Sequence, residues 1–108
     1  MNFQTSTRRN RSTDRSGRSF SDTTIAAVWA KGRPIPGEDP AVYRKDACGA
    51  RIKRSNYGLQ TTTGWEIDHV QPVSQGGSDD LSNLQPLQWE NNRHKGDDHP
   101  NWTCKVTT

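Results

Sequence analysis

Residues 65–97 read WEIDHVQPVSQGGSDDLSNLQPLQWENNRHKGD, and this stretch sets the architecture that we expect for the whole chain. Alternating apolar and polar residues at its start are typical of a strand, and a polar loop with two adjacent glycines follows. Pro86 limits the next apolar run to a short strand or a turn, because proline has no N–H to donate to a sheet. The expected strand, loop, short strand and helix cover residues 64–70, 72–83, 84–87 and 89–95. This order predicts an α+β fold.

The polar side chains of this stretch suit phosphodiester hydrolysis. His69 is the candidate general base, because the ordinary imidazole pKa of about 6.5 lies close to the operating pH. Hard divalent cations bind carboxylate and amide oxygens, and Asp68 and Asn92 provide one of each. On a helix Asn92 and Lys95 share a face, whereas His94 lies about 200° away from Asn92. We therefore assign Asn92 to a metal and Lys95 to a phosphate, and we exclude His94.

Two points of geometry decide whether these residues can form one site. A regular strand directs neighbouring side chains to opposite faces, so Asp68 and His69 can cooperate only where the strand ends or twists. Pro72 follows closely and suits such an ending. The helix register is also open at this point, because Asn91 would replace Asn92 as the ligand if the helix were turned by one residue.

The stretch resembles the HNH endonuclease family, whose ββα-metal fold carries a strand, a loop, a second strand and a helix around one cation. The Asp-His pair of that family falls on Asp68 and His69, its central Asn on Asn83, and its helical ligand on Asn92. The resemblance implies that His69 is the base, that Asp68 and Asn92 bind the metal, and that Asn83 braces the loop that positions His69. It also implies DNA as the substrate, with 5′-phosphate and 3′-hydroxyl products. Residues 29–58 resemble small stand-alone bacterial members in a Lys-Asp and Cys-Gly hairpin.

The chain departs from many such relatives in two ways. It has no CxxC pair, so we expect no structural zinc. Asn rather than His at position 92 favours magnesium or manganese, although zinc and nickel stay open because the family tolerates several metals. Without zinc, stability has to come from packing, and we expect all four tryptophans in the core, namely Trp29, Trp65, Trp89 and Trp102.

Upstream of this stretch we expect a helix and a hairpin. Ser21 and its polar neighbours can cap a short helix over residues 25–31, and Gly49 can turn a hairpin over residues 43–54. The basic residues of the hairpin are either a solvated face or phosphate contacts, and beside a nuclease site we favour phosphate contacts. The expected phosphate-binding residues are Arg44, Lys45, Arg51, Lys53 and Arg54, together with Arg93 and Lys95 of the helix.

The N-terminal residues 1–20 read as a disordered basic arm before a single nuclease domain over residues 21–108. The arm holds five arginines and one aspartate, a charge of +4, so the other residues sum to −1 in a chain whose total is +3. It has too few apolar residues to offset the entropy lost on ordering. The arm is either a solvated tail or a phosphate-binding segment that uses Arg8, Arg9 and Arg11.

The remaining expectations concern location and class. The sequence contains no run of about 18 apolar residues, the length that crosses a membrane, and no secretory signal is visible. We therefore expect a cytoplasmic protein without a membrane partner. In such a compartment Cys48 and Cys104 are expected as free thiols. The oligomeric state, monomer or dimer, stays open. The rival to an endonuclease is a catalytically silent HNH-fold module that binds nucleic acid.

Overall fold

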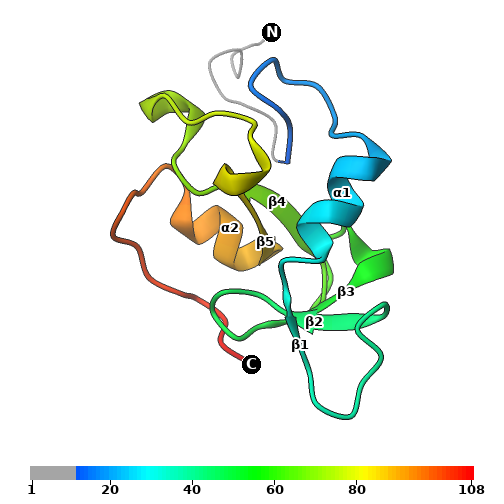
Figure 1. Ribbon diagram of the computed structural model, residues 1–108. Coiled ribbons are helices and arrows are strands. Elements are labelled where there is room, and N and C mark those ends of the chain that lie inside the picture. Colours follow the sequence, from blue (N-terminus) through cyan, green and yellow to red (C-terminus); the bar gives the residue numbers. More distant parts are fainter. Residues whose placement is uncertain (1–11) are drawn as a thin grey trace, which may run out of the picture.

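The computed structural model describes residues 12–108 and shows a mixed fold of two helices and two small antiparallel sheets (Figure 1). The elements are α1 (Asp22–Trp29), β1 (Arg33–Pro34), β2 (Tyr43–Lys45), β3 (Arg51–Lys53), β4 (Trp65–His69), β5 (Leu84–Gln88) and α2 (Trp89–Lys95). Strands β1, β2 and β3 form one sheet in that order, and β4 and β5 form the other. The α+β class is confirmed.

The central element is the hairpin of β4 and β5, paired from Trp65 opposite Gln88 to His69 opposite Leu84. β5 is longer than the short strand or turn that we expected. Pro86 is tolerated because this sheet has two strands, so β5 has an edge on which no ladder donor is required.

Alternation along β4 divides its side chains between the two helices. Trp65 and Ile67 join the apolar cluster that includes residues of α1, whereas Glu66 and Asp68 bond to residues of α2. The two helices therefore cover opposite faces of the hairpin (Figure 1).

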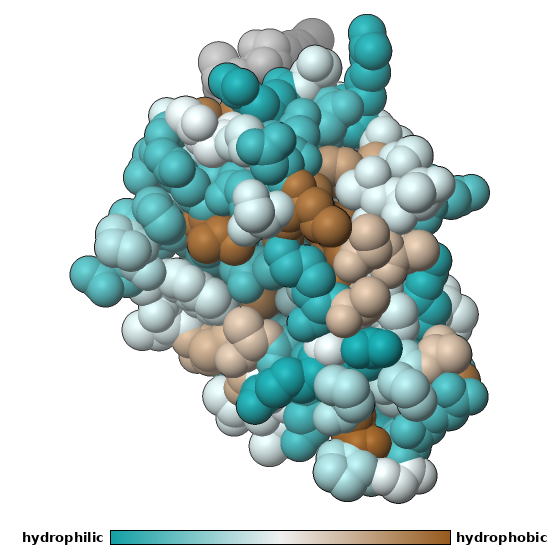
Figure 2. Space-filling view, viewed as in Figure 1, coloured by the Kyte–Doolittle hydropathy of each residue, from teal (hydrophilic) through white to brown (hydrophobic). Residues whose placement is uncertain are grey.

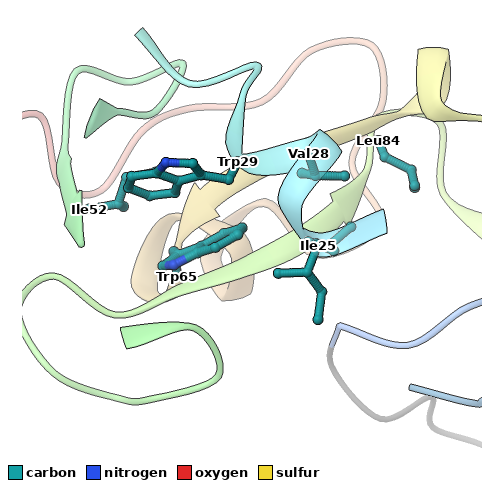
Figure 3. Close-up of a cluster of buried hydrophobic side chains, with 7 residues drawn as sticks. Ile25, Val28, Trp29, Ile52, Trp65 and Leu84 are labelled. Carbon is teal, nitrogen blue, oxygen red and sulfur yellow. The ribbon is translucent and has the colours of Figure 1, made fainter. Parts of the chain in front are cut away.

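The hydrophobic core lies between α1 and the β4–β5 hairpin. Ser21 caps α1 by accepting a hydrogen bond from the Thr24 N–H, and the helix buries a stripe of apolar residues against the indole of Trp65 (Figure 3). Trp29 and Trp65 lie 5.3 Å apart between ring centroids. Trp89 and Trp102 are only half-buried and lie outside this cluster, so the expectation of four core tryptophans is wrong for those two.

The hairpin of β2 and β3 is tied to α2 and to the C-terminal segment by the buried Asp46. Its carboxylate accepts hydrogen bonds from four N–H groups, which belong to Cys48, Ala50, Gln88 and the Asn91 side chain. This carboxylate therefore takes part in holding three separate segments, since Asn91 in turn bonds to the backbone of Lys105 and Val106.

Cys48 and Cys104 form a disulfide, so the expectation of free thiols is wrong. The two residues are 56 positions apart in the sequence. They meet because Asn91 fixes the C-terminal segment beside the turn after Asp46, a contact that no spacing in the sequence reveals. Within residues 12–108, neither helix has the length and apolarity needed to cross a bilayer.

The segment of residues 12–20 is folded, so the expectation of disorder is wrong for these residues, while the rest of the expected arm, residues 1–11, lies outside the described residues. Asp14 accepts N–H groups of the following turn, and Gly17 takes the positive φ of 80° that this turn needs. The Ser12 hydroxyl accepts the Ile67 N–H at the open edge of β4 and bonds to the Tyr57 hydroxyl. Arg8, Arg9 and Arg11 lie outside the described residues.

Candidate active site

The proposed base and both proposed ligands line one cavity of about 80 Å³. Asp68 and His69 are the last two residues of β4, and Asn92 comes from α2 on the face of the hairpin that Asp68 also occupies. The strand ends at His69, which is the condition under which neighbouring residues can serve one site. The cavity is also lined by residues of the N-terminal segment and of the turn after α2, namely Ser12, Thr13, Gly96 and Asp97.

The Asp68 carboxylate is buried, with 6 % of the residue exposed. It accepts hydrogen bonds from Gln85 Nε2 at 2.9 Å and from Lys95 Nζ at 3.3 Å. Burial raises the pKa of Asp68, and the Gln85 hydrogen bond and the Lys95 charge oppose that rise. The Asp68 carboxylate thus has one cationic partner, and hydrogen-bond donors do not surround it on all sides.

Lys95, which we expected to hold a phosphate, is fully buried and bonds to groups of the protein. Its ammonium lies 3.1 Å from the His69 carbonyl oxygen and 3.3 Å from Asp68. Because α2 packs its Asn92 and Lys95 face on β4, the long side chain reaches inward to a carboxylate that would otherwise be an unpaired buried charge. Lys95 therefore balances charge inside the site.

The imidazole ring of His69 has two neighbours, a carboxylate and an aromatic ring. Nε2 lies 2.8 Å from Asp79 Oδ1, and the Phe20 ring lies 6.0 Å away between centroids. Sequence reasoning did not identify Asp79. The only signal was a pair of aspartates in the long polar loop, and nothing in the spacing told which of them reaches His69.

Asn83 braces the loop between β4 and β5. Its amide oxygen accepts the Gln71 N–H, and its Nδ2 donates to the carbonyl oxygens of Gln71 and Ser78. A Cβ atom on Gly77 would lie 1.7 Å from the Gln71 carbonyl oxygen, so this close approach requires glycine. These contacts close the loop that follows His69 in the chain.

The α2 amides have separate roles. Asn92 Nδ2 donates to Glu66 Oε1 at 2.8 Å, so the amide oxygen is the end that remains for a cation. Asn91 is fully buried and uses both ends of its amide on Asp46 and the C-terminal segment. The alternative in which Asn91 is the ligand is therefore not supported.

The donor set fits an oxygen-preferring cation that takes few ligands from the protein. Asp68 supplies a carboxylate and Asn92 an amide oxygen on the same cavity. Among residues 12–108 no three His, Cys, Asp or Glu side chains gather as a metal-binding group. Magnesium is commonly held by one or two carboxylates, with waters and phosphate oxygens completing its shell.

Several basic side chains that we expected to contact DNA phosphates instead bind groups of the protein itself. Arg44 donates to three backbone carbonyl oxygens, Arg51 pairs with Glu38, and Arg93 pairs with Glu66. Lys45 is exposed, while Lys53 and Arg54 are half-buried. The face shown in Figure 2 is mostly hydrophilic, and its hydrophobic atoms lie in small separate groups.

Comparison with known proteins identifies the family of the site. The model of the HNH endonuclease family matches residues 46–98, a segment that begins at Asp46 and includes Asp68, His69, Asn83 and Asn92. No significant match is found among curated proteins or among solved structures. Members of this family are generally nucleases, which act on nucleic acids. Through residues 46–98, the chain belongs to the HNH endonuclease family.

Proposed function

We propose that this protein is a metal-dependent endonuclease that hydrolyses phosphodiester bonds of DNA. The observation that supports this most strongly is that Asp68, His69 and Asn92 line the same cavity inside the segment that matches the family. A module that had lost catalysis would have no need to keep a base and two oxygen ligands together. The rival, a silent nucleic-acid-binding module, therefore ranks second.

In the proposed reaction His69 takes a proton from a water molecule as the water oxygen attacks phosphorus. The P–O3′ bond breaks, the leaving oxygen takes a proton from solvent, and the products carry a 5′-phosphate and a 3′-hydroxyl. The ring is already oriented by Asp79 and Phe20, which limits the entropy lost in reaching the reactive geometry.

Asp68 and Asn92 would hold the divalent cation, for which magnesium and manganese are the first candidates. When bound, the cation supplies positive charge against the phosphate and the leaving oxygen. Glu66 orients Asn92 by accepting its Nδ2 hydrogen. Lys95 favours the ionised form of Asp68, the form that binds a cation, because its ammonium lies next to the carboxylate.

Nicking of a supercoiled plasmid tests this proposal. We expect nicked circles with magnesium or manganese, none with a chelator, and nicking about 100-fold slower or more with His69→Ala. His94→Ala is the matched control, because His94 is exposed on α2 and bonds to Thr103 away from the cavity. Resealing of the nicks by DNA ligase would support the product ends, since ligation requires a 5′-phosphate beside a 3′-hydroxyl.

Two outcomes would overturn the proposal. One is DNA binding by the wild-type protein without cleavage in magnesium, manganese, zinc or nickel, which would favour the silent module. The other is cleavage by His69→Ala at the wild-type rate.

A further inference from the structure

Asp79 connects the candidate base to the N-terminal segment. Its Oδ1 lies 2.8 Å from His69 Nε2, and its two carboxylate oxygens lie 3.1 and 3.2 Å from the backbone nitrogen of Arg15. One carboxylate thus contacts the imidazole and accepts a backbone N–H from another part of the chain. Both partners are fixed, since His69 belongs to β4 and the Arg15 segment is anchored on β4 through Ser12.

The contact on Nε2 assigns different roles to the two ring nitrogens. A neutral imidazole carries one proton, and a carboxylate at hydrogen-bond distance from Nε2 favours the tautomer in which Nε2 is the donor. In that tautomer Nδ1 has the free lone pair that a general base needs. The Phe20 ring is also a neighbour of the imidazole, at 6.0 Å between centroids.

We propose that Asp79 is a positioning residue, which holds His69 in the tautomer and orientation in which Nδ1 accepts the proton of the attacking water. This inference rests on the proposed function, in which His69 is the base. Asp79 itself touches neither water nor phosphate in this assignment, and it acts through the ring of His69.

The loop that carries Asp79 is built to keep it in place. Asn83 donates to the Ser78 carbonyl directly before Asp79, and its backbone N–H bonds to the carbonyl of Asp80 directly after it. The closure behind Asp79 depends on Gly77, which has no room for a side chain. Asp80 offers a matched control, because its exposed side chain makes no hydrogen bond among the described residues.

Steady-state cleavage of duplex DNA in magnesium tests the inference with Asp79→Ala, Asp79→Asn and Asp80→Asn. We expect Asp79→Ala to lower kcat by about 10- to 100-fold, the range typical of partners that orient a reacting group. KM for DNA should stay within about twofold, because no DNA contact is removed. Asp79→Asn keeps an acceptor oxygen for Nε2 and should recover part of the loss. Asp80→Asn should match the wild type.

A second measurement needs neither metal nor DNA. Long-range ¹H–¹⁵N correlation spectra, recorded at alkaline pH, report which ring nitrogen of His69 carries the proton. We expect the Nε2–H form in the wild type and in Asp80→Asn, and a mixture of both tautomers in Asp79→Ala. This readout would not change if Asp79 only stabilised the loop.

The outcomes separate this inference from the proposed function. Wild-type kcat and an unchanged tautomer in Asp79→Ala, with His69→Ala inactive, would overturn the role of Asp79 and leave the endonuclease standing. A wild-type protein that fails to cut DNA would overturn the endonuclease. In that case an unchanged Nε2–H tautomer in Asp79→Ala would also overturn the positioning role.

Discussion

Two buried carboxylates of this protein, Asp46 and Asp68, are held in opposite ways. Asp46 is 1 % exposed and accepts four N–H groups, all of them amides from the backbone or from Asn91. Asp68 is 6 % exposed, accepts one amide and one ammonium, and lines a cavity. Similar burial therefore accompanies very different surroundings.

This difference distinguishes Asp46, a carboxylate with a structural role, from Asp68, a carboxylate of the candidate active site. A carboxylate whose lone pairs are occupied by amides cannot take another ligand without losing hydrogen bonds. Asp46 accordingly ties the β2–β3 hairpin to α2, and the neighbouring disulfide adds the C-terminal segment. Asp68 retains capacity for a cation, and burial raises its pKa.

The largest expected loss of stability follows removal of the disulfide. Replacing Cys48 and Cys104 together by serine opens a loop of 56 residues. The chain-entropy relation for a loop of that size gives about 4 kcal/mol. We expect denaturant unfolding to show this loss. Neither cysteine lines the cavity, so kcat of the folded fraction should stay at the wild-type value. A fall in kcat larger than about threefold would show that the disulfide supports the active site. The contrast between a structural region around Asp46 and a functional region around Asp68 would then not hold.

A smaller loss is expected from Asp46→Ala, which removes the acceptor of four N–H groups, three of them in buried hydrogen bonds. Unsatisfied buried donors cost about 1–3 kcal/mol each, and partial relaxation should limit the total to about 3 kcal/mol. Chemical unfolding measures the loss, with Asp39→Ala on the exposed loop before β2 as the control. A stable Asp46→Ala protein would show that the hydrogen bonds of Asp46 do not hold the hairpin to α2.

The smallest expected effect is on the free energy of unfolding at acidic pH. Burial raises the pKa of Asp79, but the His69 hydrogen bond, the Arg15 N–H and the charges of His69 and Arg15 together outweigh burial and lower the pKa below its ordinary value. Its contribution is therefore fully present above the ordinary carboxyl pKa and is lost as pH falls through the lowered value. Wild type should exceed Asp79→Asn by no more than about 1 kcal/mol at neutral pH. Thermal unfolding across the acid range should show the two curves converging at low pH, and a difference that grows on acidification would contradict this assignment.

Local signals in the sequence were sufficient for most elements. The cap at Ser21, the apolar stripe of α1 and the alternation in β4 depend on residues close together in the chain, so periodicity and capping could predict them. The separate roles of Asn91 and Asn92 could not be fixed in this way. They depend on where α2 begins, and Gln88 sets that point by accepting the N–H groups of Glu90 and Asn91.

The missed features all depend on contacts between distant segments. The Cys48–Cys104 bond requires the C-terminal segment to return to the hairpin. Asp79 meets His69 because the loop folds back behind β4, and Lys95 turns inward because Asp68 lies beneath α2. Ser12 is held at the edge of β4 by the Ile67 N–H and by the Tyr57 hydroxyl. Charge and composition of the individual segments contain none of this information.

The central claim is that His69 moves a proton while Asp68 helps to hold a cation, and one measurement separates the two roles. Single-turnover cleavage of duplex DNA is followed across a magnesium series with wild type, His69→Ala and Asp68→Asn, the last keeping an acceptor for Gln85 and Lys95. We predict that His69→Ala lowers the plateau rate by about 10²–10⁴-fold and leaves the half-saturating magnesium concentration at the wild-type value. Asp68→Asn should raise the half-saturating magnesium about tenfold or more, because a neutral amide binds a hard cation less tightly than a carboxylate. A wild-type plateau in His69→Ala, or a wild-type magnesium dependence in Asp68→Asn, would contradict the claim.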